Sequence, residues 1–391
     1  MADWLQCTIG DLCDTISETY KRNDTEVVLI NTSDVLEGKI LNRKKVENKN
    51  LKGQFKKTFQ RDEILYSEIR PANKRFAYID FDDTQQYIAS TKLMVLRPNP
   101  EKVRPRFLFA VLKSKQVLNE LQLLAETRSG TFPQITFGSE LSPMPIMLPS
   151  LNTQQKIIGI LDAIEEKIEE NENINKNLEE QAQALFDDFF LHRDVLPVGW
   201  KQGSLLDIAD YLNGLAMQKF RPVEGEDGIP VLKIKELRQG MCDLSSELCT
   251  PNIKSEYIVS DGDVIFSWSG SLLVDFWCGD TCGLNQHLFK VTSSKYDKWF
   301  YYAWTKHHLA KFIALASAMA TTMGHIKRGE LANSTVLIPN NSDYDNIGSV
   351  LQPMYDLIIA NRIENARLSN LRDDLLPKLM SGKIDVSEVE L

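Results

Sequence analysis

The residues best suited to chemistry form a basic stretch between Lys39 and Arg61. Nine lysines and arginines lie there against one acidic residue, Glu47, and Phe55 and Phe59 are interleaved with them. Such a stretch neutralises phosphates, so it predicts nucleic-acid binding with a strong salt dependence. A solvated surface loop is the alternative interpretation. Within this stretch the candidate DNA contacts are Lys44, Lys45, Lys56, Lys57 and Arg61.

Further candidates lie in loops and turns between strand-like runs. In the first half of the chain they are Arg70, Lys74, Arg75 and Arg128; in the second half they are Lys219, Arg221, Lys233, Lys235, Asn285, Gln286, His287, His325 and Lys327. Lysine and arginine hold phosphates, and amide side chains have the geometry to read adenine. The two amides at 285 and 286 could equally cap a strand.

Motifs for catalysis are missing from the sequence. It contains no GxxxxGK[ST], no GxGxxG after a strand, no HExxH, no GxSxG and no amino-methyltransferase [DNS]PP[YF] loop. Asp34, Glu37 and Lys39 could imitate a nuclease site, but the second half has no matching set of charges. Cys278 and Cys282 lack a second pair at zinc spacing. We therefore expect no catalytic residue, no metal site and six reduced cysteines.

Composition points to an ordinary globular protein. The chain has 391 residues, 43% hydrophobic and 25% charged, which suggests two or three domains. Its net charge of −9 argues against a uniformly basic nucleic-acid binder, so charge must be considered segment by segment. No apolar run reaches about 18 residues and the start lacks the features of a signal peptide. We expect a cytoplasmic protein without a membrane span.

Two long helices must position the candidate residues. Apolar residues recur about every 3.5 positions from Ile157 to Phe189, and the same pattern recurs 190 positions later, which predicts helices that pack lengthwise. Each seam carries two asparagines at matching places: Asn171 and Asn175, then Asn361 and Asn365. We expect an antiparallel pair about 50 Å long, with Asn171 near Asn365 and Asn175 near Asn361 to fix the register. Two unrelated amphipathic helices are the alternative.

The segments that precede the helices also repeat. Trp4, Gln6, Asp11 and Asp14 recur with the same spacing from Trp200 onward. The whole chain is thus one unit of about 190 residues written twice. We expect a short helix after each tryptophan, a curled and mostly antiparallel sheet, and helices over 106–126 and 296–316. The predicted fold is mixed α/β, with two similar α+β domains at 1–150 and 193–340 and helices at 151–192 and 341–391, related by a pseudo-two-fold repeat.

Two similar heads on an antiparallel helix pair could reach two half-sites on one duplex. At about 3.4 Å per base pair, a spacer of about 50 Å corresponds to about one and a half turns of DNA. The helix seams of the two copies agree while their loops differ. That combination favours a pseudo-symmetric body that reads an asymmetric, split sequence.

Several motifs make the sequence resemble the specificity subunit of type I restriction–modification enzymes. They are Trp4 with Ile9-Gly10-Asp11-Leu12, Gly130-Thr131-Phe132, Leu148-Pro149 with Gln154-Gln155-Lys156-Ile157-Ile158, and the ending Leu375 to Ile384. The resemblance covers the full length. It departs in the second copy, where Tyr344-Asp345-Asn346 replaces Gln154-Gln155-Lys156, so we expect subunit contacts to differ there.

The resemblance implies a non-catalytic subunit with two target-recognition domains, each reading one half of a bipartite DNA site. Its helices would set the gap and dock two methyltransferase subunits, which carry the S-adenosylmethionine site. A restriction and translocase subunit would supply the ATP and magnesium chemistry, leaving this chain without a cofactor. A coiled-coil scaffold whose heads bind protein, and a self-contained modification enzyme, are the alternatives.

Overall fold

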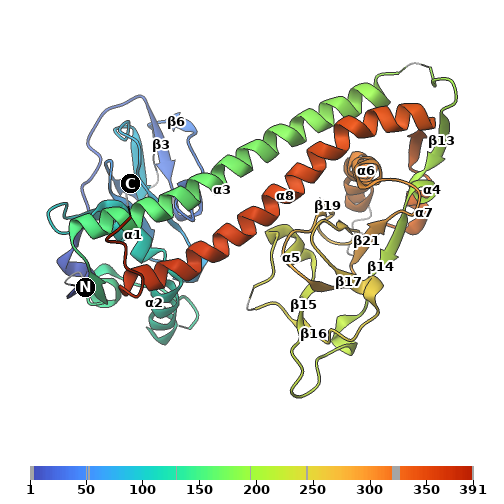
Figure 1. Cartoon of the computed structure of the whole chain (residues 1–391). Coiled ribbons are helices and arrows are strands. Elements are labelled where there is room, and N and C mark those ends of the chain that lie inside the picture. Colours follow the sequence, from blue (N-terminus) through green and yellow to red (C-terminus); the bar gives the residue numbers. More distant parts are fainter. Residues whose placement is uncertain are drawn as a thin grey trace. The chain divides into compact units, whose positions relative to one another are not determined.

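The computed structural model describes residues 4–49, 51, 53–128, 130–193, 195–243, 245–318 and 326–389. The chain divides into two compact units: unit 1 comprises Met1–Glu166 and Ser369–Leu391, and unit 2 comprises Lys167–Leu368. Each unit has its own sheets and its own part of two long helices (Figure 1). The predicted domain limits treat these helices as separate segments, whereas each compact unit includes a stretch of both.

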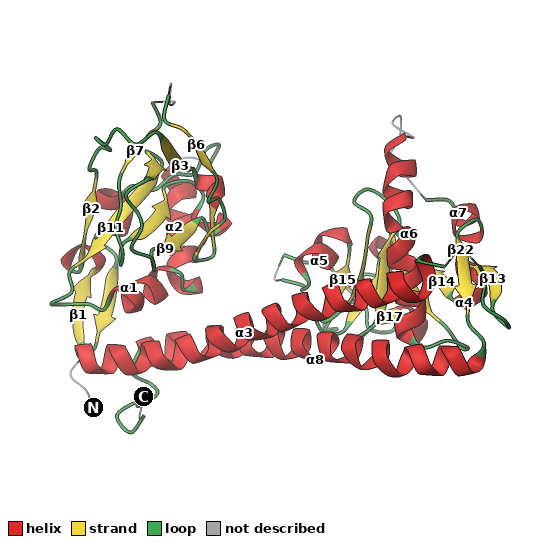
Figure 2. Ribbon diagram, turned by 90° about the horizontal axis from the view of Figure 1, so that it is seen from above, coloured by secondary structure: helices red, strands yellow, loops and turns green. Residues whose placement is uncertain are grey.

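The strands of unit 1 are β1 (Leu5–Thr8), β2 (Cys13–Ile16), β3 (Glu26–Ile30), β4 (Val35–Leu36), β5 (Lys39–Ile40), β6 (Lys45–Glu47), β7 (Phe55–Lys57), β8 (Ile64–Ser67), β9 (Phe76–Tyr78), β10 (Tyr87–Ser90), β11 (Leu93–Pro98) and β12 (Pro145–Leu148). Its helices are α1 (Pro105–Leu112) and α2 (Lys115–Arg128). Figure 2 shows these strands and helices by type.

Two four-stranded sheets, in the orders β6-β3-β10-β7 and β2-β11-β8-β9, form the body of unit 1. Among their described pairs, β3–β10 is parallel and the others are antiparallel. Alternate residues of β11 enter different cores: Met94 and Leu96 lie in one with α1, while Leu93 and Val95 lie in the other. The strand is thus covered on both faces, which explains its nearly continuous apolar sequence.

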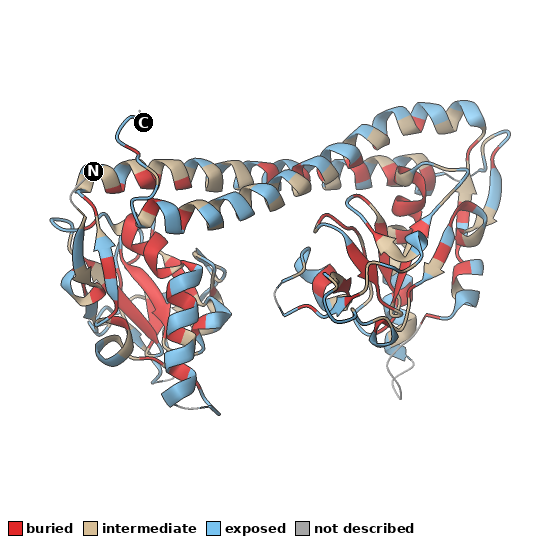
Figure 3. Cartoon of the chain, turned by 60° about the horizontal axis from the view of Figure 1, so that its bottom comes forward, coloured by how far each residue is buried: buried red, intermediate tan, exposed pale blue. Residues whose placement is uncertain are grey.

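The strands of unit 2 are β13 (Lys201–Ser204), β14 (Asp210–Asn213), β15 (Ile229–Leu232), β16 (Leu248–Cys249), β17 (Ile258–Val259), β18 (Val264–Ser267), β19 (Leu273–Phe276), β20 (Cys282–Leu284), β21 (Leu288–Thr292) and β22 (Thr335–Ile338). Its shorter helices are α4 (Leu205–Ile208), α5 (Ile234–Gln239), α6 (Lys298–Ala318) and α7 (Arg328–Ala332). Figure 3 shows that buried residues concentrate on the sheets and on the inner helix faces of each unit.

The sheets of unit 2 repeat the plan of unit 1. Their orders, β14-β21-β18-β19 and β16-β15-β20-β17, match β2-β11-β8-β9 and β6-β3-β10-β7, and the parallel pair recurs as β15–β20. The repeated aspartates cap the same turn in both copies, because Asp11 accepts the backbone N–H of Thr8 at 2.8 Å and Asp207 that of Ser204 at 2.7 Å. The bond from the backbone N–H of Thr8 lowers the pKa of the Asp11 carboxyl, and those from the hydroxyl and then the backbone N–H of Ser204 lower the pKa of the Asp207 carboxyl. The internal repeat predicted from the sequence is confirmed.

The two long helices, α3 (Leu151–Phe186) and α8 (Asn341–Met380), pack against each other antiparallel within each unit. In unit 2 the side-chain amide of Asn171 donates to Asn365 and that of Asn361 to Asn175, both at 2.9 Å. Remaining amide hydrogens reach backbone carbonyls of the opposite helix, at 3.3 Å for Asn175 and 3.2 Å for Asn365. Both predicted asparagine pairs are confirmed, and their polar groups are satisfied although the side chains are largely buried.

Three local predictions need correction. The stretch after each tryptophan is not one helix: a strand, a single helical turn and a second strand follow one another, as in β13, α4 and β14. The helix predicted over 106–126 is interrupted near Lys113 and Ser114, so that α1 and α2 take different directions. In place of a single curled sheet, each unit has two four-stranded sheets and additional two-stranded sheets, β1-β12 and β4-β5 in unit 1 and β13-β22 in unit 2.

Candidate nucleic-acid interface

The two units carry a matched group of turns at one end of their sheets. In unit 1 the turn Thr91-Lys92 joins β10 to β11, and in unit 2 the turn Asn285-Gln286-His287 joins β20 to β21. We call this end of each unit the turn end. The loop that follows β8 or β18 lies beside this turn, because Leu93 pairs with Ser67 and Leu288 with Ser267.

In unit 1, Lys92 occupies the centre of the turn end. Its ammonium lies 3.3 Å from a carboxylate oxygen of Glu68 and donates at 3.2 Å to the side-chain oxygen of Gln134. The backbone N–H of Glu68 also donates to the carbonyl of Lys92 at 3.0 Å, which fixes the loop against the turn. The Lys92 side chain remains 48% exposed. A lysine, a carboxylate and an amide thus form a small, partly exposed hydrogen-bonding group in the turns next to β8 and β11.

Three predicted basic residues join this group. Lys57 donates to the carbonyls of Thr91 at 3.1 Å and Leu93 at 2.8 Å, and burial lowers its pKa. Lys57 therefore braces the turn from inside, whereas its neighbour Lys56 is exposed. Arg70 is exposed at the start of the next loop, where its backbone has a positive φ of 45°.

Two more predicted residues support that loop. Arg75 donates to the carbonyls of Ser33 at 3.1 Å and Val35 at 3.2 Å, which ties β9 to the segment after β3. Lys74, with a φ of 53°, pairs with Glu37 at 2.6 Å. Both side chains therefore make contacts within unit 1, and each uses part of its hydrogen-bonding capacity there.

The remaining basic candidates of unit 1 lie apart from the turn end. Lys44 and Lys45 are exposed beside or on β6, at the opposite edge of its sheet from β7. Arg61 pairs with Asp82 at 2.8 Å and Arg128 with Glu140 at 3.1 Å. The sequence-predicted patch is therefore not one continuous surface.

In unit 2, the predicted Asn285, Gln286 and His287 form the turn itself. Asn285 is only 5% exposed; its side chain accepts the backbone N–H of His287 at 3.2 Å and donates to Gln286 at 3.1 Å. The backbone N–H of Gln286 donates to the carbonyl of Leu215 at 2.9 Å. Asn285 thus acts as a turn cap, the alternative left open by the sequence, while Gln286 and His287 are half-exposed.

Trp268 lies beside this turn. Its indole N–H donates to Asn213 at 3.0 Å, and its ring centroid is 6.2 Å from that of His287. The ring nitrogen Nδ1 of His287 lies 3.1 Å from the hydroxyl of Ser269. The backbone N–H of Ile326 donates to the carbonyl of Trp268 at 3.0 Å, which brings the exposed Lys327 to the same end.

All the other predicted residues of unit 2 except His325 fall within the described part of the chain, and Lys233 is next to a residue bonded to the turn end. Lys233 follows β15, whose last carbonyl accepts the N–H of Asn285 at 3.2 Å. Lys233 and Arg221 share the carboxylate of Glu247.

Lys235 lies 3.3 Å from Asp243, whose pKa falls to about 2 mainly through the hydroxyl of Ser245 and also through Lys235. Lys219 is exposed on a short helical turn. His325 lies outside the described residues.

Sequence reasoning missed the members of the turn end that are not in basic runs. They are Glu68, Lys92 and Gln134 in unit 1 and Asn213, Trp268 and Ser269 in unit 2. One signal was available, because Ser67 and Ser267 end matching strand motifs and the next residue differs completely, glutamate in one copy and tryptophan in the other.

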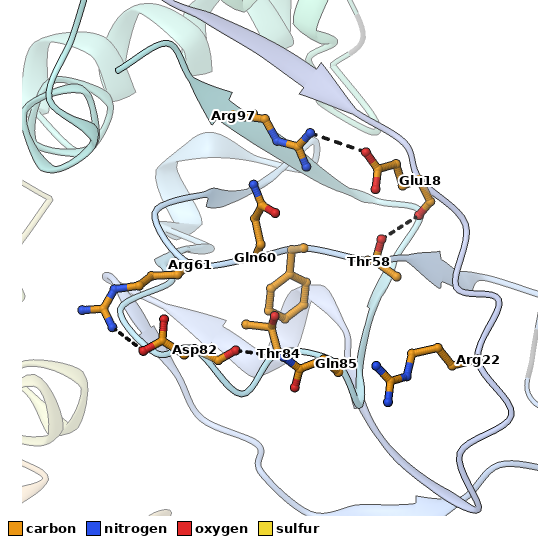
Figure 4. Close-up of a pocket in the computed structure, with 10 residues that line it drawn as sticks. Glu18, Arg22, Thr58, Gln60, Arg61, Asp82, Thr84, Gln85 and Arg97 are labelled. Atoms are coloured by element: carbon orange, nitrogen blue, oxygen red, sulfur yellow. Dashed lines mark hydrogen bonds and ion pairs between the residues drawn. The ribbon is translucent and has the colours of Figure 1, made fainter. Parts of the chain in front are cut away.

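A separate hollow of about 450 Å³ lies on unit 1 (Figure 4). Its lining includes three arginines, each of which has a carboxylate partner: Arg22 pairs with Asp24, Arg61 with Asp82, and Arg97 with Glu18 and Glu63. Because its lining includes none of the residues of the turn end, we do not assign this hollow to the DNA interface.

Over the described part of the chain, no cluster of three or more histidine, cysteine, aspartate or glutamate side chains is arranged to hold a metal ion. The same residues include no helix that is both long and apolar enough to cross a bilayer.

Comparison with known families defines the class of protein. The type I restriction modification DNA specificity domain matches residues 1–180 and 197–370. The chain is 26% identical to the HindI specificity subunit of Haemophilus influenzae, over 98% of this chain and 100% of that one. It is 27% identical to the MjaIX specificity subunit of Methanocaldococcus jannaschii, over 72% of this chain and 70% of that one.

A solved structure shows a similar fold. The type I restriction–modification S subunit of Mycoplasma genitalium aligns with a TM-score of 0.55 and 14% identity, covering 97% of this chain and 96% of that one. The family match spans most of the chain, so the protein belongs to the type I restriction–modification DNA specificity family. It is a non-catalytic specificity subunit whose partners are DNA and a restriction–modification complex.

Proposed function

We propose that each unit reads one half of a bipartite DNA site with its turn end. The proposal rests on a contrast between the backbone arrangement, which is the same in the two units, and the exposed side chains, which differ. Strand order, turn position and loop position agree in the two units, yet Lys92 and Glu68 occupy in one the places that His287 and Trp268 occupy in the other. Two copies of one frame with different exposed groups suit an asymmetric target, because base contacts specify the sequence.

The basic residues around the turn end would supply the phosphate contacts that position each unit. Lys56, Arg70, Lys327 and Lys219 are exposed. Phosphate contacts give affinity without sequence information. These basic residues would therefore hold the DNA backbone, while the groups at the centre of each turn end contact the bases.

The paired helices would dock two methyltransferase subunits and a restriction subunit. Val350 and Leu357 are exposed one heptad apart on α8, and Leu371 follows two heptads further on. Exposed apolar residues in line on a helix suit a partner helix. S-adenosylmethionine would belong to the methyltransferase, and ATP with magnesium to the restriction subunit, so that this chain holds no cofactor. A scaffold whose heads bind protein is the less favoured candidate, because the matching family is one of DNA specificity.

DNA retention at rising salt, with the methyltransferase subunit present, tests the proposal. We expect affinity to fall steeply with salt concentration, and Lys56→Ala to reduce the slope of log K against log salt by about 0.9. Lys57→Ala is the matched comparison, because its ammonium is bonded to two carbonyls and should contribute little to the slope. Retention that is absent, or insensitive to salt, would favour the scaffold.

A further inference from the structure

We propose that the two turn ends read different base chemistry: Lys92 and Glu68 of unit 1 recognise a G·C pair, and Gln286 of unit 2 recognises an A·T pair. The inference rests on the proposed DNA-reading function and names the residues and the bases for each half-site.

In unit 1 a cation and an acceptor stand side by side. The ammonium of Lys92 lies 3.3 Å from the carboxylate of Glu68 and both groups come from ordered strand ends. In the major groove guanine offers two acceptors, O6 and N7, and cytosine offers the N4 amino donor. Lysine suits the guanine and a carboxylate suits the cytosine, so this pair of side chains complements both bases of a G·C pair.

Gln134 and Lys57 hold that pair in place. The side-chain oxygen of Gln134 accepts from Lys92 at 3.2 Å, and Lys57 fixes the turn through the carbonyls on either side of Lys92. A positioned donor loses less conformational entropy on binding than a free lysine. Gln134 and Lys57 are thus positioning residues, and Lys92 and Glu68 are the proposed contacts.

In unit 2 the matching turn presents neutral hydrogen-bonding groups. The side-chain oxygen of Gln286 accepts from the buried Asn285 at 3.1 Å, and its amide nitrogen lies 3.4 Å from the ring nitrogen Nε2 of His287. An amide can donate to N7 of adenine and accept from its N6 amino group. The half-buried Trp268 offers an apolar surface nearby, which suits the thymine methyl group.

Asn285 acts through Gln286 rather than on DNA. Asn285 is 5% exposed, and its side-chain oxygen accepts the backbone N–H of His287. It therefore orients the side-chain amide of Gln286. Gln286 is therefore the specificity-determining residue of this turn.

The test is to map methylated adenines genome-wide in cells that express the full chain with the methyltransferase subunit of its system. Gln286→Glu should change the preferred base at one position of one half-site from adenine to cytosine, because glutamate accepts from cytosine N4. Lys92→Ala should reduce the preference for guanine at one position of the other half-site by about 5- to 150-fold, and Lys92→Arg should restore it.

Lys21→Ala and Gln202→Ala are matched controls, since both side chains are exposed elsewhere in units 1 and 2. They should leave the motif unchanged. The inference is overturned if the Gln286 and Lys92 variants keep the wild-type motif, or if Lys92→Ala lowers methylation equally at all sequences, as loss of a phosphate contact would do. Absence of any bipartite motif that depends on this chain would instead refute the proposed function itself.

Discussion

Unit 1 and unit 2 share one strand plan but attach to their helix segments through different ion pairs. In unit 1 the body supplies the cations: Arg106 pairs with Asp162 of α3 at 3.2 Å, and Lys115 pairs with Asp373 of α8 at 2.8 Å. The carboxylates lie on the long helices, so the body meets an acidic surface.

In unit 2 the shorter ion pairs come from an arginine of the long helix α8, and Lys306 of α6 adds a longer contact, 3.9 Å from Glu179 of α3. Arg362 of α8 donates to Asp275 of β19 at 2.6 Å and to Glu179 of α3 at 2.8 Å, and these carboxylates raise its pKa even though burial opposes them. One arginine thus joins both helices to the body. The two copies of one frame therefore use different ion pairs between the body and the long helices.

Other contacts keep the same role with different residues. Before α1, the side-chain oxygen of Gln154 accepts the backbone N–H of Arg104 at 2.8 Å. Before α6, the hydroxyl of Tyr344 accepts the backbone N–H of Asp297 at 2.7 Å. The departure at Tyr344 therefore has an internal explanation, because glutamine and tyrosine both orient the helix that follows β11 or β21.

The largest predicted difference between the units concerns the ion pairs between each body and the long helices. Arg362→Ala leaves the partly buried Asp275 without its cation and Glu179 with only Lys306 at 3.9 Å, and should lower the free energy of unfolding of unit 2 by about 2–3 kcal/mol. Arg106→Ala, whose side chain is 48% exposed, should cost unit 1 about 0–1 kcal/mol. Urea unfolding followed by hydrogen exchange in each unit measures both. Equal costs would show that the two docking modes are equivalent.

Substitution of the paired Asn175 and Asn361 should have a smaller effect on the free energy of unfolding. Asn361→Leu removes the partner of one buried amide and should cost about 1–2 kcal/mol. The double variant Asn175→Leu with Asn361→Leu removes both polar groups, so the free energy of unfolding should stay nearly the same or rise. Without this buried polar pair, the register of α3 against α8 should be less well fixed. Chemical denaturation measures the energies, and disulfide trapping between α3 and α8 measures register. A double variant as costly as the single one would count against the pairing.

A third predicted difference between the units depends on pH. Burial lowers the pKa of His308 to about 4, and its Nε2 lies 2.9 Å from the carbonyl of Thr335. The unfolded state binds the proton at higher pH than the folded state, so unit 2 loses stability as pH falls from about 6.5 toward about 4.

A loss of about 1–2 kcal/mol between pH 6.5 and 5 is expected from this histidine. His307, also lowered by burial, adds to it. All five histidines lie between residues 192 and 325, so unit 1 provides the internal control. Hydrogen exchange at several pH values should show the change in unit 2, and His308→Gln should reduce it. An equal change in unit 1 would contradict this assignment.

Much of the fold could be predicted because it depends on periodicity and repetition. The seams of α3 and α8, with Asn171 opposite Asn365, follow from spacing alone, and the repeated tryptophans define the two copies. The division of the strands into separate sheets could not be predicted, since it depends on which face of β11 meets which core. The candidate site was harder still: Lys57 and Asn285 look like DNA contacts in sequence, yet tertiary contacts turn both toward the backbone.

The most direct test of the central claim is a genome-wide map of methylated adenines with and without this gene, in the presence of its methyltransferase. We predict one asymmetric motif of two defined halves separated by bases that are not read, and its complete disappearance when the gene is deleted. A single continuous motif, or a methylation pattern that survives the deletion, would contradict the account in which two matched units each read one half of the target.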